Sequence, residues 1–462
     1  MPNTKMKILF FSPPSELSEF NIKDENRIYP LGLAYLGAVL EGEKHKVKVF
    51  DYFQETWDEV KGKIFQTITN EKPDIVGISS MTMNRTSSFK LIKIAKDINP
   101  KIKVIMGGVH STAMHEQILK NFAVDFICRG ESEETIVELV EAIKKSKQLR
   151  YFKKIPGIVF KENEDIIRTD DRGYIKDLDK IPFPKHDYFA DRIREKKKAY
   201  VMTSRGCPFG CAFCSTSAYW GKMWRGRSVK NIMKELKFLI KNFPDLEEIF
   251  FADDEFTLNE KRIINLCKEM IKENIQLRWT CSTRVSSVSE ELAHWMKKAN
   301  CVKVSLGVES GDPGLIKWIG KRITNKQVED ALRIFYNVEI PTSIFLITGI
   351  PGENSRTVNK TIKLLKKVAK YKTEFKKPAL LQIYPHTRIY ELAKEQGIIN
   401  DDFWLTDKLV PHYTYEHSKN KLLYWSMKIA LYHRYYQGEL FRFLLKAISN
   451  PLKSLKIIKL GK

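Results

Sequence analysis

Three cysteines lie close together in the middle of the chain: Cys207, Cys211 and Cys214 in the stretch SRGCPFGCAFCS. Thiolates are preferred ligands of iron–sulfur clusters, so three of them spaced C-x3-C-x2-C can hold three irons of a [4Fe–4S] cube. Gly206 and Gly210 allow the backbone to wrap tightly around such a cube. Because no fourth cysteine is near, the fourth iron stays open to another ligand. We therefore expect a catalytic cluster rather than a closed structural site.

Two other uses of these cysteines are weaker. A structural zinc site would need a fourth Cys or His nearby, and the next cysteine, Cys267, falls in a segment with the pattern of a helix. A disulfide with one spare thiol would need an oxidising compartment. The remaining cysteines are scattered along the chain, at positions 128, 267, 281 and 301. This usage is typical of a reducing compartment, and we expect a cytoplasmic protein.

The composition is that of a globular chain with a strong positive charge. Its 462 residues suffice for two or three domains, and 79 basic against 56 acidic residues give a net charge of +23. The charge favours nucleic acid, anionic membrane or acidic substrates as partners, but a lysine-rich proteome explains it equally well. We expect no signal peptide, and no apolar run reaches the roughly 18 residues of a spanning helix.

The cysteine loop follows a strand-like segment, and strands and helices alternate after it. Strands are expected at residues 199–203, 248–252, 277–282, 302–308, 342–348 and 379–383. Helices are expected between them, at residues 229–242, 260–273, 289–298, 325–337 and 356–371. Six such units over residues 199–390 predict a partial (β/α)6 barrel. Its chemistry would lie at the carboxyl ends of the strands.

The first part of the chain, residues 1–145, shows the same alternation. Strands are expected at residues 7–11, 46–50, 75–79, 103–106 and 124–128, with helices at 31–41, 57–70, 87–98, 113–121 and 133–145. This pattern predicts an α/β domain with a doubly wound, Rossmann-like parallel sheet. Its ligand would bind at the carboxyl ends of the strands. No G-x-G-x-x-G follows the first strand, which argues against a dinucleotide.

The remaining segments connect or extend these domains. Residues 146–198 are expected to be a linker that contains a β-hairpin across residues 162–164 and a proline-rich connector near residue 183. Residues 391–462 are expected to form a helical tail. From Lys419 onward the tail is basic and aromatic, with Glu439 as its one acid.

The cysteine motif, with Phe213 before the last cysteine, resembles the signature of the radical S-adenosylmethionine (SAM) superfamily. The resemblance implies that the amino and carboxylate groups of SAM chelate the open iron. It also implies that an electron from the cluster cleaves SAM to a 5′-deoxyadenosyl radical. The electron would come from a donor such as flavodoxin or ferredoxin.

Several residues at the expected barrel strand ends match elements of that family. The D-D-x-F-T element at residues 253–257 implies SAM contacts for Asp254. Asp254 or Glu255 would also take up a substrate proton, with a metal site as the alternative. Arg284 would bind a carboxylate at the barrel mouth, or form a surface salt bridge. Residues 307–311 resemble the SAM-ribose segment, and residues 346–353 the segment that packs on adenine. These two segments give Glu309, Ser310, Gly349 and Gly352 as cofactor contacts.

The first domain resembles the cobalamin-binding domain that precedes many radical SAM domains. The matching pieces are residues 30–36, 49–51, 76–79, 107–110 and 129–133. The implied cofactor contacts lie in the loops after the strands: Ser79, Thr82, Gly107, Gly108, His110, Gly130 and Glu131. The chain lacks the D-x-H-x-x-G motif whose His replaces the lower cobalt ligand, so a non-His residue or water is expected there. His110 is expected at a ligand edge and not on cobalt. A flavodoxin-like domain without a cofactor is the alternative.

The basic tail admits three interpretations. Apolar residues mixed with Trp, Tyr and cations are typical of helices on a membrane surface, and polybasic segments favour anionic lipids. Alternatively, the tail covers the barrel with a helix pair whose lysines are solvated. Nucleic-acid binding has no supporting motif, and we expect none.

These features together predict a cobalamin-dependent radical SAM enzyme with a [4Fe–4S] cluster, SAM and cobalamin as cofactors. The expected reaction is methyl transfer to an unactivated carbon through the 5′-deoxyadenosyl radical and methylcobalamin. The rival is cyclisation, rearrangement or carbon–carbon coupling on a lipid or other hydrophobic substrate. A methylthiotransferase would need three more N-terminal cysteines, and only Cys128 is present. A cobalamin or redox sensor without turnover is the alternative outside enzymes.

Overall fold

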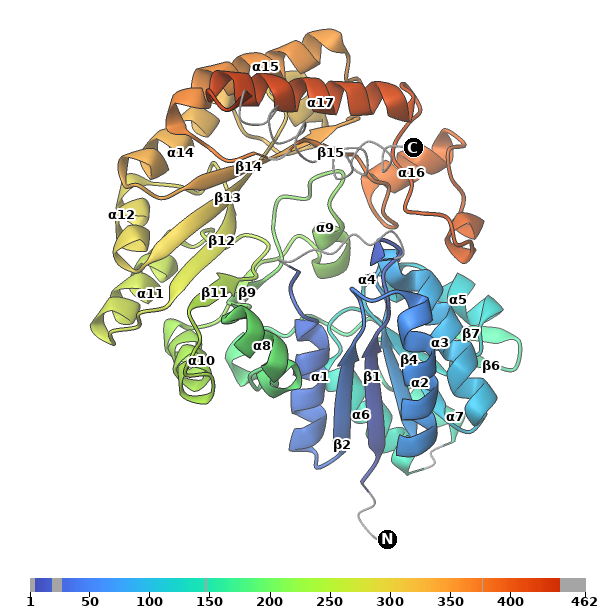
Figure 1. The fold of residues 1–462 in the computed structure, drawn as a ribbon. Coiled ribbons are helices and arrows are strands. Elements are labelled where there is room, and N and C mark those ends of the chain that lie inside the picture. The colour runs from blue at the N-terminus through green and yellow to red at the C-terminus, as the bar shows by residue number, and fades with distance from the viewer. Residues whose placement is uncertain (1–4, 19–26, 146–147, 376, 441–462) are drawn as a thin grey trace. The chain divides into compact units, whose positions relative to one another are not determined.

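The computed structural model describes residues 5–18, 27–145, 148–375 and 377–440 (Figure 1). The chain divides into two compact units. The N-terminal unit consists of residues up to Arg192 together with Ile399–Val410, and the barrel unit consists of Ile193–Ile398 and the residues from Pro411 onward. We call Ile399–Val410 the strap. The strap was expected to be part of the C-terminal tail. In the structure it belongs to the N-terminal unit.

The N-terminal unit is built on one seven-stranded sheet in the order β2-β1-β3-β4-β5-β6-β7. Its first five strands are parallel: β1 (Lys7–Ser12), β2 (Lys46–Asp51), β3 (Ile75–Ser79), β4 (Lys103–Gly107) and β5 (Phe126–Cys128). The expected hairpin exists as β6 (Ile158–Glu162) and β7 (Asp165–Arg168), and it extends this sheet in antiparallel fashion. The order reverses between β1 and β3. Ligands of doubly wound sheets bind at that point.

Helices cover both faces of this sheet. They are α1 (Leu31–Gly42), α2 (Trp57–Glu71), α3 (Arg85–Ile98), α4 (Val109–Ala113), α5 (His115–Asn121), α6 (Glu133–Lys144) and the short α7 (Leu149–Phe152). Helix α1 packs beside α6, and α2 packs beside α3. The helix expected at residues 113–121 corresponds to α5, and the short helix α4 before it, separated from α5 by Met114, was not expected. The doubly wound parallel sheet expected from the sequence is confirmed.

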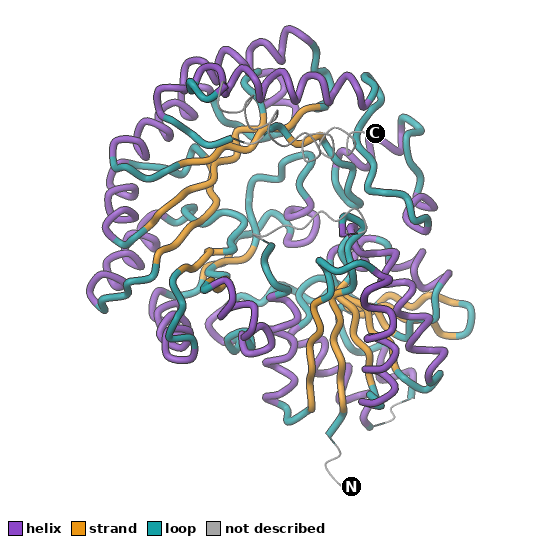
Figure 2. The backbone as a smooth tube through the Cα atoms, in the orientation of Figure 1, coloured by secondary structure: helices purple, strands orange, loops and turns teal. Residues whose placement is uncertain are grey.

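The barrel unit contains a curled sheet of six parallel strands with helices on its outer face (Figure 2). The strands are β8 (Lys198–Val201), β11 (Glu248–Phe251), β12 (Arg278–Arg284), β13 (Cys301–Glu309), β14 (Thr342–Thr348) and β15 (Ala379–Leu380), in that order across the sheet. The expected partial (β/α)6 barrel is confirmed. The last strand is shorter than expected, since only two residues pair with β14.

The outer helices of the barrel unit begin at side chains that cap them. They are α10 (Val229–Asn242), α11 (Glu260–Lys272), α12 (Glu290–Lys298), α14 (Asn325–Asn337) and α15 (Ser355–Val368). Each is preceded by a Ser, Asn or Thr whose side chain accepts a hydrogen bond from a backbone N–H of the first turn. Such caps fix where each helix starts and so fix the loops that precede it. The unit also contains the shorter helices α9 (Ser215–Trp220), α13 (Pro313–Trp318) and α16 (Arg388–Glu395), and α8 (Ala190–Lys196) spans the boundary between the two units.

The basic tail contains one described helix, α17 (Lys419–Tyr436), which packs on α15 and on β14 and β15. Its inner face buries Leu422, Trp425 and Ile429. The tail residues from 441 onward, which the membrane interpretation includes, lie outside the described residues. Among the described residues, no helix is both long and apolar enough to cross a membrane.

Candidate active site

The cysteine loop begins where β8 ends. It starts with a two-residue strand, β9 (Ser204–Arg205), which pairs with β10 (Arg225–Gly226) in antiparallel register. Gly206 has a φ of +85°, and a Cβ there would collide with the carbonyl oxygen of Met223. Gly210 has a φ of +64°. The tight wrapping expected of both glycines therefore corresponds to backbone conformations that other residues adopt only with strain.

The three thiols of this loop are free and partly exposed. Burial, with smaller contributions from Glu255, Cys211 and Cys214, raises the pKa of Cys207 to about 11. Among the described residues, no three Cys, His, Asp or Glu side chains converge tightly enough to hold a metal ion. The loop thus brings the three sulfurs within electrostatic reach of each other without a disulfide. Three thiols in one loop are the donor type that an iron–sulfur cluster takes, but in this structure their sulfurs do not converge on one point.

Asp253 connects the start of the cysteine loop to the end of β11. Its buried carboxylate accepts hydrogen bonds from the Thr203 N–H (2.6 Å) and the Ser204 hydroxyl (2.5 Å). Arg262 lies 3.8 Å from the same carboxylate. The first acid of the D-D-x-F-T element therefore holds the scaffold in place and is not available to a metal ion or substrate.

Asp254 is the exposed acid at this strand end. Its carboxylate accepts hydrogen bonds from the Thr216 hydroxyl (3.0 Å) and from the backbone N–H of Gly206. It therefore lies against the cysteine loop, with room for a further ligand. Glu255 is almost completely buried and accepts a hydrogen bond from the Thr283 hydroxyl (2.6 Å). Its carboxylate ties the end of β11 to the end of β12.

Arg284, at the end of β12, faces the cysteine loop. Its guanidinium lies 3.7 Å above the centre of the Phe209 ring, and its Nη1 lies 3.8 Å from the Cys211 sulfur. Its Nη2 donates a hydrogen bond to the carbonyl oxygen of Lys321. Arg284 is only 6% exposed, so the surface salt bridge considered from the sequence is ruled out. Although burial raises the pKa of Cys211, Lys321 and Arg284 both counteract that rise, which favours a thiolate.

Glu309 is held at the end of β13 with a φ of +66°, after an irregularity in the pairing with β14. Its buried carboxylate pairs with Lys321, whose Nζ lies 2.5 Å from Glu309 Oε1. Gly307 provides the space for this pair, because a Cβ there would collide with Lys321 Nζ. Lys321 is a site residue that the sequence analysis missed.

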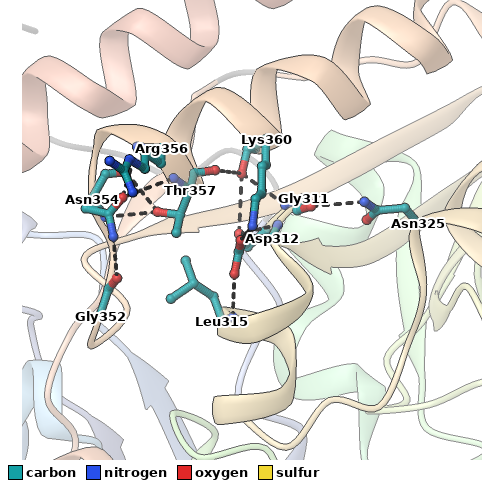
Figure 3. Close-up of polar contacts among 11 residues, drawn as sticks. Gly311, Asp312, Leu315, Asn325, Gly352, Asn354, Arg356, Thr357 and Lys360 are labelled. Carbon is teal, nitrogen blue, oxygen red and sulfur yellow. Dashed lines mark hydrogen bonds and ion pairs between the residues drawn. The ribbon is translucent and has the colours of Figure 1, made fainter.

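The segment after Glu309 is fixed from several sides (Figure 3). Thr361 on α15 accepts a hydrogen bond from the Gly311 N–H (3.0 Å), and Ser310 Oγ accepts one from the Asp312 N–H (3.1 Å). Asp312 also pairs with Lys360 (2.7 Å). The hydroxyl of Ser310 is thus engaged in shaping this turn, and a contact to SAM would be an additional one.

The glycines after β14 form a turn that two carboxylates cap. Gly349 has a φ of +97° and donates its N–H to Glu353 Oε2 (2.5 Å). Gly352 has a φ of +85° and donates its N–H to Glu416 (2.8 Å). Glu353 is 2% exposed, and burial raises its pKa to about 7. The turn therefore depends on an acid that changes its charge near neutral pH.

The loops at the carboxyl edge of the N-terminal sheet contain small residues and unpartnered polar atoms. Gly108 has a φ of +100°, and a Cβ there would lie 2.6 Å from the Ser80 carbonyl oxygen. The Ser80 hydroxyl and both ring nitrogens of His110 are buried without a hydrogen-bond partner. Burial lowers the pKa of His110 to about 3, so the ring is neutral. His110 has no exposed surface.

The other expected cofactor contacts in this unit fall into two groups: partly exposed residues at the edge of the sheet and buried residues beneath them. Ser79 and Gly107 end β3 and β4 and are partly exposed, and a Cβ on Gly130 would meet nothing within 4 Å. Thr82 and Glu131 are buried, and Glu131 accepts a hydrogen bond from the Ile175 N–H (2.8 Å). Small residues at the edge, with open space at Gly130, fit a large flat cofactor such as cobalamin.

Comparison with known proteins agrees with both parts of this geometry. Residues 201–365 match the model of the radical SAM superfamily, and residues 20–140 match that of the B12 binding domain. An uncharacterised methyltransferase of Pyrococcus horikoshii is 37% identical over 406 residues, which cover 86% of this chain and 85% of that protein. The chain belongs to the cobalamin-binding radical SAM enzyme family. The resemblance seen in the sequence is thereby confirmed.

Other members of the family extend the comparison. An anaerobic magnesium-protoporphyrin IX monomethyl ester cyclase of Rubrivivax gelatinosus is 30% identical over 72% of this chain and 61% of that protein. The solved structure of the radical SAM methyltransferase TsrM from Kitasatospora setae aligns with a TM-score of 0.70 at 19% identity, over 85% of this chain and 77% of that one. The chain is therefore an enzyme with the TsrM-like fold. Its cofactors are a [4Fe–4S] cluster, SAM and cobalamin.

Proposed function

We propose that this cobalamin-binding radical SAM enzyme transfers a methyl group to an unactivated carbon of a small organic substrate. One observation supports the proposal most: a single chain contains both a sheet edge of small residues that suits cobalamin and a three-cysteine loop next to the cations Arg284 and Lys321. The Pyrococcus relative, a methyltransferase by name, covers both units. When bound, the cluster and SAM supply a carbon radical, and cobalamin supplies a transferable methyl group.

The residues of the barrel unit would share this work as follows. Cys207, Cys211 and Cys214 would hold the cluster, with Arg284 and Lys321 as fixed positive charges that stabilise the sulfurs. Asp254, which is exposed beside the loop, would accept hydrogen bonds from SAM. Among the remaining candidates, Glu309, Ser310, Gly349 and Gly352 would shape the rest of the SAM site. The buried Glu255 would position Arg284 and would not transfer a proton.

In the N-terminal unit, the partly exposed Ser79, Gly107 and Gly130 would contact cobalamin directly. Gly108 would allow the close approach of the backbone. The buried residues Thr82, His110 and Glu131 would support these loops from beneath. This division follows exposure: Ser79, Gly107 and Gly130 are partly exposed, whereas Thr82, His110 and Glu131 are at most 6% exposed.

Anaerobic reconstitution of the full chain with iron, sulfide and cobalamin tests the proposal. We expect about four irons per chain, as a [4Fe–4S] cluster requires. Cobalamin should bind, and with dithionite as the electron donor SAM should yield both 5′-deoxyadenosine and S-adenosylhomocysteine. The matched control, Cys214→Ala, should bind cobalamin but produce no 5′-deoxyadenosine. A wild-type chain that binds no cobalamin would contradict the methyl-transfer proposal.

Cyclisation is the second candidate, because the chain also resembles anaerobic magnesium-protoporphyrin cyclases. The same reconstituted enzyme distinguishes the two reactions. Methyl transfer consumes one SAM to supply the methyl group, so S-adenosylhomocysteine forms along with 5′-deoxyadenosine. Cyclisation without methyl transfer would form 5′-deoxyadenosine alone.

We further propose two partners: a one-electron donor such as flavodoxin or ferredoxin, and an anionic membrane surface. The second rests on the outer face of α17, where Tyr424, Met427, Leu431, Tyr432 and Tyr435 are between 38% and 62% exposed. Lys421 and Lys428 lie on the same face by helical spacing. Exposed aromatics beside cations favour the interface of anionic lipids. Sedimentation with anionic vesicles should retain the wild type. The variant Tyr424→Ser/Leu431→Ser should bind less, and equal binding would contradict the proposal.

A further inference from the structure

The strap is fastened to the N-terminal unit by one completely buried arginine. Arg85, the first residue of α3, donates hydrogen bonds to three carbonyl oxygens of the strap: those of Trp404 (3.3 Å), Thr406 (3.2 Å) and Lys408. Its side chain has no exposed surface. A guanidinium can direct several N–H groups to different acceptors at once, which the ammonium group of lysine cannot do with the same geometry.

The same guanidinium also binds the loops that precede α3. Arg85 Nη1 donates to the Thr82 carbonyl oxygen and to Glu16 Oε2, both at 3.0 Å. The other oxygen of Glu16 accepts a hydrogen bond from the Val410 N–H (2.9 Å). Glu16 and Arg85 therefore form a buried ion pair that connects the loop after β1, the loop after β3 and the strap. Removing one member of such a pair leaves an uncompensated buried charge.

Trp404 carries the connection to a third segment. Its ring is completely buried, and His110, in the helix α4 directly after β4, lies against it at 5.9 Å between ring centres in an edge-on arrangement. The Arg85 guanidinium lies 5.3 Å from the centre of the Trp404 ring. Gln117, on α5, donates a hydrogen bond from its side-chain amide to the Asp401 carbonyl oxygen. The strap thus contacts the segments that follow β3 and β4.

These loops follow β1, β3 and β4 at the carboxyl edge of the sheet, where the strand order reverses and ligands bind. They include Thr82, Gly108 and His110, which we place in or beneath the cobalamin site. We propose that the strap is a structural part of that site and that Arg85 is its positioning residue. Arg85 sets the loops at the spacing that cobalamin requires without touching the cofactor. This inference rests on the proposed cobalamin binding.

Arg85→Lys in the full-length chain tests the inference, because lysine keeps the charge beside Glu16 but cannot reach all the strap carbonyls. We expect the affinity for hydroxocobalamin, measured by difference absorbance, to fall at least tenfold. Iron content and SAM affinity should stay within about twofold of wild type. The electron paramagnetic resonance spectrum of bound cob(II)alamin should also change. An unchanged affinity and spectrum would overturn the inference.

Lys96→Met is the matched control, because Lys96 lies on the same helix but at the opposite edge of the sheet. It pairs with Asp125 (2.6 Å) and donates to the Ile102 carbonyl oxygen (2.8 Å). Its cobalamin affinity should equal that of wild type, and an equal loss in both variants would overturn the inference. If Arg85→Lys does not accumulate, Glu16→Gln is tested instead. We expect its cobalamin affinity to fall at least threefold, and an unchanged affinity would overturn the inference. A wild type without cobalamin affinity would instead contradict the proposed function.

Discussion

Replacing Lys321 with methionine should destabilise the barrel unit by about 3–5 kcal/mol, because it leaves the Glu309 carboxylate buried without its cation. The pair is short, at 2.5 Å, and both side chains are at most 8% exposed. The same change removes a positive charge that favours the thiolate of Cys211. The Glu309 carboxylate also loses the charged hydrogen bond that holds it in the proposed SAM site. Because such a bond contributes enough for about a tenfold change, SAM affinity should fall by about tenfold or more. Urea denaturation and SAM titration of the reconstituted enzyme measure the two effects.

A double variant separates stability from ligand binding. Lys321→Met combined with Glu309→Met removes both charges, so most of the lost stability should return. SAM binding should remain weak, because the carboxylate proposed to contact the ribose is also gone. A double variant that binds SAM like the wild type would contradict the role proposed for Glu309. A Lys321→Met variant as stable as the wild type would show that Glu309 does not depend on this partner.

Replacing Glu353 with glutamine should remove a pH-dependent loss of stability. Burial raises the pKa of Glu353 to about 7, so the folded chain holds a proton that the unfolded chain releases near pH 4.5. The folded state therefore binds more protons between these values, and stability falls as pH rises from 4.5 to 7. The loss approaches about 3 kcal/mol above pH 7, at 1.36 kcal/mol for each pKa unit. The variant keeps an acceptor for the Gly349 N–H.

Urea denaturation of matched chains at pH values from 4.5 to 8 measures the slope of the unfolding free energy against pH. Glu353→Gln should match the wild type at the acid end and exceed it at pH 8. Glu416→Gln is the control, because Glu416 also raises the pKa of Glu353 but less than burial does. Its slope should stay above half that of the wild type. A Glu353→Gln chain whose slope equals that of the wild type would contradict the assigned pKa.

Features with local causes could be predicted from the sequence. The strands of both sheets follow from short β-rich segments between helical periodicities, and the cysteine loop follows from spacing within one segment. The positions of Asp254 and Arg284 at strand ends follow from the same regularity, because polar residues that end parallel strands meet at one edge of the sheet. The fold and the general location of the site are therefore local properties of this sequence.

Features with long-range causes could not be predicted. Lys321 lies in the segment Gly320-Lys321-Arg322, which has the composition of a surface turn. It is buried only because Gly307, on a different element, leaves space for its ammonium group. The contacts of the Arg284 guanidinium with the Phe209 ring and the Lys321 carbonyl oxygen could not be predicted either, because both partners are distant in sequence. No periodicity in the strap indicates that its carbonyl groups surround Arg85.

The strap also determines when the N-terminal unit can finish folding on the ribosome. The last strap residue, Val410, is made 218 residues after Arg192, the difference between positions 410 and 192. At roughly 5–20 residues per second, translation of that interval takes about 10–40 s. During this time the Arg85 guanidinium has no strap carbonyls to bind. The N-terminal unit thus begins synthesis first, but its last segment is made only after the six barrel strands, and premature termination before Ile399 would yield a sheet whose buried arginine lacks three of its acceptors.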